Sequence, residues 1–165
     1  MFRNILVAFD GSPPAEVALH HAVDLARAEG ARVTVLTAFP SYVDIASTAA
    51  MAGGTRINMD EILQQLQADA KALLDAARAR IPEGVPSQTV AASGAPAQVV
   101  LEQVRKGQHD LVVMGSRGRT GLGAMLLGSV SHNVVHHSHV PVLIVPARKD
   151  DEPLEKESSP AATEE

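Results

Sequence analysis

The stretch that decides the fold runs from Leu111 to Ser131 and reads L-V-V-M-G-S-R-G-R-T-G-L-G-A-M-L-L-G-S-V-S. It opens with an apolar run that is typical of a buried strand, turns at Gly115 into a glycine-rich loop, and resumes as a helix after Gly128. Glycines let backbone amides approach a ligand closely, and a helix start offers N–H groups without intrahelical partners. Since Arg117 and Arg119 add positive charge, the stretch predicts an oxyanion site suited to phosphate groups.

Upstream of this stretch, apolar strands alternate with amphipathic helices. Residues 3–9 read as a strand buried on both faces, and Ser12 and Pro13 read as the cap and first residue of a helix that Gly30 ends. Further strands are expected at 32–39, 85–92, 110–114 and 140–145, and further helices at 59–80, 97–106 and 129–137. The polar character of 85–92 indicates a sheet edge. This order predicts an α/β fold, an open parallel five-stranded sheet with helices on both faces.

Two segments fall outside the alternation. Residues 41–58 are polar or small and include Gly53 and Gly54, and they are long for a connection, so we expect an ordinary mobile insertion or a lid over a ligand. The end of the chain is acidic and rich in Pro, Ser and Ala. We therefore divide the chain into one domain, 1–147, and an acidic disordered tail, 148–165.

Composition excludes several classes of protein. The 165 residues include no cysteine, which rules out disulfides, thiolate metal sites and a cysteine nucleophile. Lysine and arginine form no cluster and aromatic residues are few, so we predict no nucleic-acid partner. The apolar run at the N-terminus is too short for a signal sequence or a membrane span. We expect a cytoplasmic protein that does not engage a membrane.

Motifs for metals and for catalysis are incomplete. His132 and His136 are four residues apart, but Asn133 stands where a zinc protease needs glutamate, and we predict no metal site. The loops hold neither the Lys-Ser/Thr of a P-loop nor the G-x-S-x-G elbow of a hydrolase. With no clear catalytic base, the pattern favours a binding protein over an enzyme.

One spacing is more specific. Gly115, two residues, Gly118, nine residues and then Gly128-Ser129 give G-x2-G-x9-G-[ST], which resembles the ATP-binding signature of the universal stress protein family. The resemblance runs from Asn4 to Pro146. It includes N-I-L-V-A-F-D-G-S from Asn4, S-G-A-P from Ser93, D-L-V-V-M-G-S-R-G from Asp110 and V-P-V-L-I-V-P from Val140.

The resemblance implies the strand order 3-2-1-4-5, which would bring Asp10 beside the glycine loop at the switch point of the sheet. It also implies a set of nucleotide-contacting residues. Asp10 would accept a hydrogen bond from ribose or help to hold Mg²⁺ near phosphate, although it could merely cap the next turn. The backbone of Ala38 would meet the adenine edge. The full set is Asp10, Ser12, Pro13, Ala38, Met114, Gly115, Arg117, Gly118, Gly128, Ser129, Val130 and Ser131.

In that set the hydroxyls of Ser129 and Ser131 would donate to phosphate oxygens, with Ser129 as a plain helix cap being the alternative. The function implied is a stress-response regulator that binds ATP, AMP or another adenine nucleotide and forms a homodimer through Val142–Val145. Two alternatives stay open. One is a slow ATPase or autophosphorylating enzyme, and the other is a dimeric interaction module that works without nucleotide.

Overall fold

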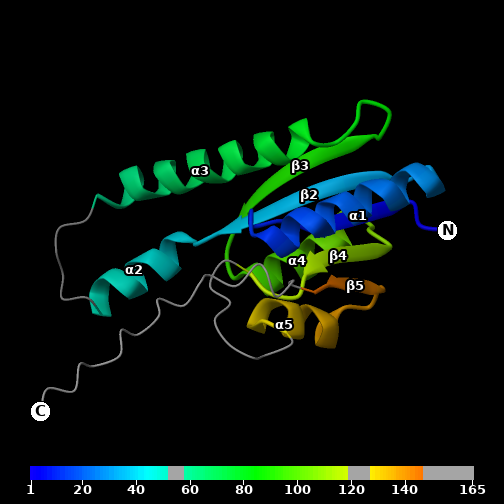
Figure 1. Ribbon diagram of the computed structural model, residues 1–165. Coiled ribbons are helices and arrows are strands. Elements are labelled where there is room, and N and C mark those ends of the chain that lie inside the picture. Colours follow the sequence, from blue (N-terminus) through cyan, green and yellow to red (C-terminus); the bar gives the residue numbers. More distant parts are fainter. Residues whose placement is uncertain (52–57, 119–126, 147–165) are drawn as a thin grey trace, which may run out of the picture.

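The computed structural model describes residues 1–51, 58–118 and 127–146. Its five strands are parallel and lie in the order β3-β2-β1-β4-β5 (Figure 1), which confirms the predicted topology. The strands are β1 Asn4–Ala8, β2 Arg32–Phe39, β3 Ser87–Ser93, β4 Leu111–Gly115 and β5 Val142–Val145. The helices are α1 Pro13–Glu29, α2 Tyr42–Met51, α3 Met59–Ala79, α4 Pro96–Lys106 and α5 Ser129–His137.

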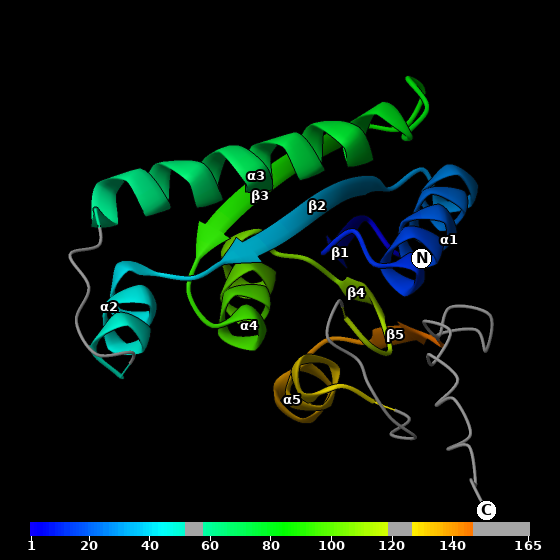
Figure 2. The same cartoon turned by 60° about the vertical axis from the view of Figure 1, so that its left-hand side comes forward.

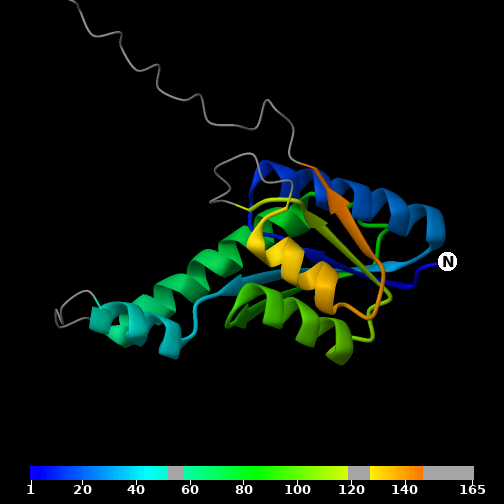
Figure 3. The same cartoon turned by 90° about the horizontal axis from the view of Figure 1, so that it is seen from below.

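Helices cover both faces of the sheet because successive strand residues point to opposite sides. Ile5 and Val7 of β1 join one buried cluster with side chains of α1 and α3, whereas Leu6 joins a second cluster with side chains of α4 and α5. Views from two directions show α4 and α5 side by side on the face opposite α1 (Figures 2 and 3). The near-continuous apolar strands therefore find partners on both faces, as a parallel sheet requires.

The stretch 41–58 contains a helix, α2, over residues 42–51, which the sequence analysis did not predict. Ser41 and Asp44 cap its start reciprocally. The Ser41 backbone N–H donates to Asp44 Oδ2 at 2.8 Å, and the Asp44 N–H donates to Ser41 Oγ at 3.4 Å. This S-x-x-D pattern is a helix-start signal that the sequence analysis overlooked. Figure 1 shows α2 beyond the end of β2, next to the start of α3.

The two edge strands differ in character. β3 is half-buried or exposed along its length, which confirms the edge position predicted from its polar residues. β5 is apolar, and Leu143 on it is 41% exposed. In the described part of the chain β5 pairs with β4 alone, so its outer edge keeps free hydrogen-bonding groups.

Some predictions fall on residues that the structure does not describe. These are the tail at 148–165, the residues from Arg119 to 126, and the segment 52–57 between α2 and α3. Among the helices of the described ranges, none combines the length and the apolar character that a membrane crossing needs.

Candidate functional site

The chain changes winding direction between β1 and β4. These two strands are neighbours with Ala8 opposite Met114, yet β1 leads through α1 to β2 on one side while β4 leads towards α5 and β5 on the other. In open parallel sheets, ligands bind outside the carboxyl ends of the two strands that flank such a switch. The residues that follow β1 and β4 are therefore the place to look for a site.

Asp10 follows β1 and lies against Gly118. A Cβ atom built on Gly118 would stand 2.7 Å from Asp10 Oδ2, so only glycine permits this approach without a shift. The other carboxylate oxygen, Oδ1, accepts hydrogen bonds from the Ser12 hydroxyl at 2.6 Å and from the Ser12 backbone N–H at 3.1 Å. The structure thus brings Asp10 and the glycine loop together, as predicted.

Ser12 occupies the capping position of α1, but its side chain does not cap the helix. Its hydroxyl donates to Asp10 instead, which corrects the role predicted for it. Pro13 is the first residue of α1, as expected, and its fixed φ suits that position. Ser12 is buried, and its hydrogen bond holds the Asp10 carboxylate in place.

Gly115 lets the end of β4 pack against the start of α1. A Cβ atom on it would lie 2.8 Å from Pro14 Cβ, and 3.1 Å from both the Pro14 carbonyl carbon and the Arg117 carbonyl oxygen. Two of those three atoms belong to the backbone and cannot swing away. Gly115 is therefore needed for packing, whether or not a ligand binds beside it.

The start of α5 is fixed to the end of β4 by backbone contacts. The Gly128 N–H donates to the Ser116 carbonyl at 2.7 Å, and Gly128 itself is the capping residue. Ser129 is consequently the first helical residue, so the alternative in which it caps the helix is wrong. The first intrahelical bond runs from the His132 N–H to the Gly128 carbonyl at 2.9 Å. The three amides before it belong to the helix end that favours anions.

Ser131 is buried, and its hydroxyl faces the protein rather than solvent. It donates to the Gly115 carbonyl at 2.9 Å and to the Ser116 carbonyl at 3.1 Å. Its one proton is engaged there, which leaves the backbone N–H, and not the hydroxyl donation that we expected, for an anion. Ser131 ties α5 to β4.

Of the remaining predicted residues, some pack in the hydrophobic core and others lie nearer to solvent at the site. Met114 is buried in the cluster beneath α4 and α5, and Val130 packs against that cluster. Ala38 lies near the carboxyl end of β2, opposite Ala92. Arg117 is half-buried, and Ser129 is exposed at the start of α5.

The sequence analysis missed two residues that shape this edge. Ser116 is buried, and its carbonyl accepts both the Gly128 N–H and the Ser131 hydroxyl. Gly11 has a φ of 77°, and a Cβ atom on it would lie 2.8 Å from Leu73 Cδ1. The D-G-S run after a buried strand signalled the turn at Gly11, whereas nothing in the sequence signalled its contact with α3.

The described side chains at the carboxyl ends of the strands do not form a metal-binding site. Among the described ranges there is no group of three or more histidine, aspartate or glutamate side chains that could hold a metal ion. His132 and His136 do approach each other on α5, with ring centroids 4.4 Å apart. What the edge offers is one carboxylate on the β1 side and backbone amides on the β4 side. That pairing suits a ligand with hydroxyl groups at one end and phosphate at the other.

The sequence profile of the universal stress protein family matches residues 1–146. The chain belongs to this family. It is 37% identical to universal stress protein YxiE of Bacillus subtilis, over 88% of this chain and 99% of that relative. It is 31% identical to universal stress protein MJ0531 of Methanocaldococcus jannaschii, over 92% of this chain and 86% of that relative.

Solved structures share the fold of this chain. The hypothetical protein MJ0577 superposes with a TM-score of 0.76 at 26% identity, over 90% of this chain and 98% of that one. A universal stress protein in complex with cAMP gives a TM-score of 0.64 at 26% identity, over 88% and 97% of the two chains. An Arabidopsis thaliana family member with AMP bound gives 0.65 at 19% identity, over 93% and 97%, which supports the fold alone.

Proposed function

We propose that this universal stress protein binds an adenine nucleotide at the carboxyl ends of β1 and β4 and serves as a nucleotide-dependent regulator in the cytoplasm. The observation that carries the proposal is the placement of the Asp10 carboxylate against Gly118, at the switch point and beside the start of α5. An oriented carboxylate facing a glycine turn and a helix N-terminus is the arrangement by which doubly wound folds hold ribose and phosphate.

Each part of the nucleotide has a counterpart in the site. The phosphates would lie at the start of α5, where Ser129 and its neighbours provide amides outside the intrahelical ladder. Arg117 and the exposed Ser129 hydroxyl would add donors. The ribose hydroxyls would donate to Asp10, whose position Ser12 maintains. The adenine would lie towards Ala38 at the end of β2.

The cAMP complex of a related protein supports this assignment. That protein is 26% identical to this chain and shares its fold over nearly the full length of both. ATP and AMP carry the same adenosine group as cAMP and differ in their phosphates. In our proposal the phosphates are bound by the glycine turn and the start of α5. ATP carries the most phosphate groups of the three nucleotides, so it is the first ligand to test.

We further propose that the protein forms a homodimer through β5. The strand is apolar and leaves an edge unpaired among the described residues. Leu143 on that strand is 41% exposed and Val135 on the adjoining α5 is 43% exposed. A second copy pairing edge to edge would satisfy the free backbone groups and cover these side chains.

Thermal unfolding tests the nucleotide site. Nucleotide-stripped protein is unfolded with and without ATP and magnesium, with GTP as the control for base selectivity. ATP at a hundred times its dissociation constant adds about 2.7 kcal/mol of stability, and we expect a rise in melting temperature of a few degrees. No rise at millimolar ATP would overturn the proposal and favour an interaction module that works without nucleotide.

A further inference from the structure

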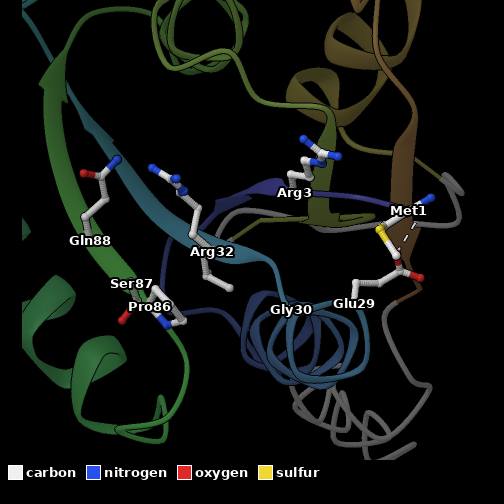
Figure 4. Close-up of a pocket in the computed structure, with 9 residues that line it drawn as sticks. Met1, Arg3, Glu29, Gly30, Arg32, Pro86, Ser87 and Gln88 are labelled. Atoms are coloured by element: carbon white, nitrogen blue, oxygen red, sulfur yellow. Dashed lines mark ion pairs between the residues drawn. The ribbon is translucent and has the colours of Figure 1, made fainter.

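A pocket lies at the amino ends of the strands, the edge of the sheet opposite the nucleotide site proposed above. It has a volume of about 560 Å³ and is formed by the beginnings of β1, β2 and β3 and the end of α1 (Figure 4). That volume lies within the range of sites for small molecules. The residues that line it are Met1, Arg3, Glu29, Gly30, Arg32, Val33, Pro86, Ser87 and Gln88.

Two arginines stand next to each other in this pocket. The Arg32 backbone N–H donates to the Arg3 carbonyl at 3.0 Å, which joins the beginnings of β1 and β2. Figure 4 shows both side chains pointing away from the end of α1 at Gly30. Within the described residues neither guanidinium makes an ion pair or a hydrogen bond, although the whole chain carries a net charge of −5. Two adjacent arginines without counterions form a place that favours an anion.

Among the described residues, the carboxylate in the pocket forms no ion pair with either arginine. Glu29 Oε2 accepts the Phe2 backbone N–H at 3.0 Å and lies 3.7 Å from the Met1 amino nitrogen. Asp110, at the start of β4, accepts the backbone N–H groups of Arg3 and Asn4 at 2.7 Å and 2.9 Å. Both carboxylates thus bind backbone groups at the strand and chain ends, and neither pairs with an arginine side chain. The two guanidinium groups can therefore bind a ligand.

The wall of the pocket on the β3 side is polar. The Gln88 amide nitrogen donates to Thr34 Oγ1 at 3.0 Å, which holds that side chain at the pocket wall. Gln88 is in register with Thr34, two residues along β2 from Arg32, so Gln88 and Arg32 lie on the same face of the sheet.

From these contacts we propose that the pocket binds a small polyvalent oxyanion, a molecule with two or more phosphate or carboxylate groups, through Arg3 and Arg32. Each planar guanidinium pairs with one such group through two parallel hydrogen bonds, and neighbouring arginines select ligands with two groups over those with one. This pocket is separate from the proposed nucleotide site, and the proposal for the pocket does not depend on nucleotide binding.

Nuclear magnetic resonance titration tests the proposal at residue level. The full chain, labelled with ¹⁵N, is titrated with inorganic pyrophosphate and, in a second series, with citrate. We expect saturable shifts of the amide signals of Arg32, Ser87 and Gln88. The variants Arg3→Gln and Arg32→Gln should each weaken binding by at least about tenfold, because each removes one charge-assisted contact.

The control is Arg78→Gln, which removes an arginine of α3 that is also exposed but does not line the pocket. It should bind like the wild type. All four proteins should unfold at similar temperatures, since the three arginines are exposed. Shifts that do not saturate, shifts confined to Gly115–Gly118 and Ser129, or equal affinity in the pocket variants and the wild type would each overturn the proposal. Saturation by one probe alone would assign the site to phosphate or to carboxylate.

Discussion

The sharpest test of the nucleotide site compares Gly118→Ala with Gly128→Ala, because the two changes add the same methyl group on either side of the loop. At Gly118 the new carbon would stand 2.7 Å from Asp10 Oδ2. A carbon–oxygen contact needs roughly 3.3 Å, so the carboxylate must move by roughly 0.6 Å. That movement strains the hydrogen bonds of 2.6 Å and 3.1 Å that hold it to Ser12.

We expect Gly118→Ala to lower the free energy of unfolding by about 1–2 kcal/mol, the value of a weakened pair of hydrogen bonds to a charged group. If the Asp10 carboxylate holds the ribose, nucleotide affinity should fall by about tenfold or more. Urea unfolding followed by circular dichroism measures the first quantity, and isothermal titration calorimetry with ATP measures the second.

Gly128→Ala is the matched control for the effect on stability. Its methyl group would lie 3.5 Å from the Ser116 carbonyl oxygen and 3.6 Å from Arg117 Cα, which are ordinary contacts. The backbone φ of −71° suits alanine. The weaker capping by alanine and the lower entropy of the unfolded chain oppose each other, so stability should change by no more than about 0.5 kcal/mol. Wild-type nucleotide affinity in Gly118→Ala would refute the role that we give to Asp10.

Three further predictions concern packing, pH and assembly. Gly115→Ala should destabilise the protein by about 1–3 kcal/mol, since its methyl group meets Pro14 and backbone atoms, and urea unfolding checks this. Burial lowers the pKa of His109 against its bond to the Gln103 carbonyl. As pH falls, the His109 imidazole is therefore protonated in the unfolded chain before it is protonated in the folded protein. The free energy of unfolding should fall as pH drops below about 6.5, by at most about 1.4 kcal/mol per pH unit. His109→Gln should flatten that part of the profile of unfolding free energy against pH. Leu143→Glu should convert the proposed dimer to monomer in light scattering while the fold is retained, and a variant that stays dimeric would place the interface elsewhere.

The sequence predicted most elements because local patterns mark their ends. Ser12-Pro13 at the start of α1 and Gly30 at its end bound the helix as expected, and Gly30 adopts a φ of 68°. The helix α2 was missed because small and polar residues hid its capping pair, Ser41 and Asp44. Composition distinguished the two edge strands. The polar residues of β3 tolerate solvent, whereas the apolar residues of β5 do not.

The linear sequence determined that this chain forms a parallel α/β sheet with a glycine-rich turn after β4. These features depend on short-range periodicity and on residues with distinctive backbone preferences. Only the tertiary structure decided how side chains distant in sequence share their hydrogen bonds. It turned Ser12 towards Asp10 and committed the Ser131 hydroxyl to carbonyls at the end of β4. It also brought Arg3 beside Arg32 at the opposite edge. Such partners are set by strand order and register, which arise from packing the whole chain and leave no local signal.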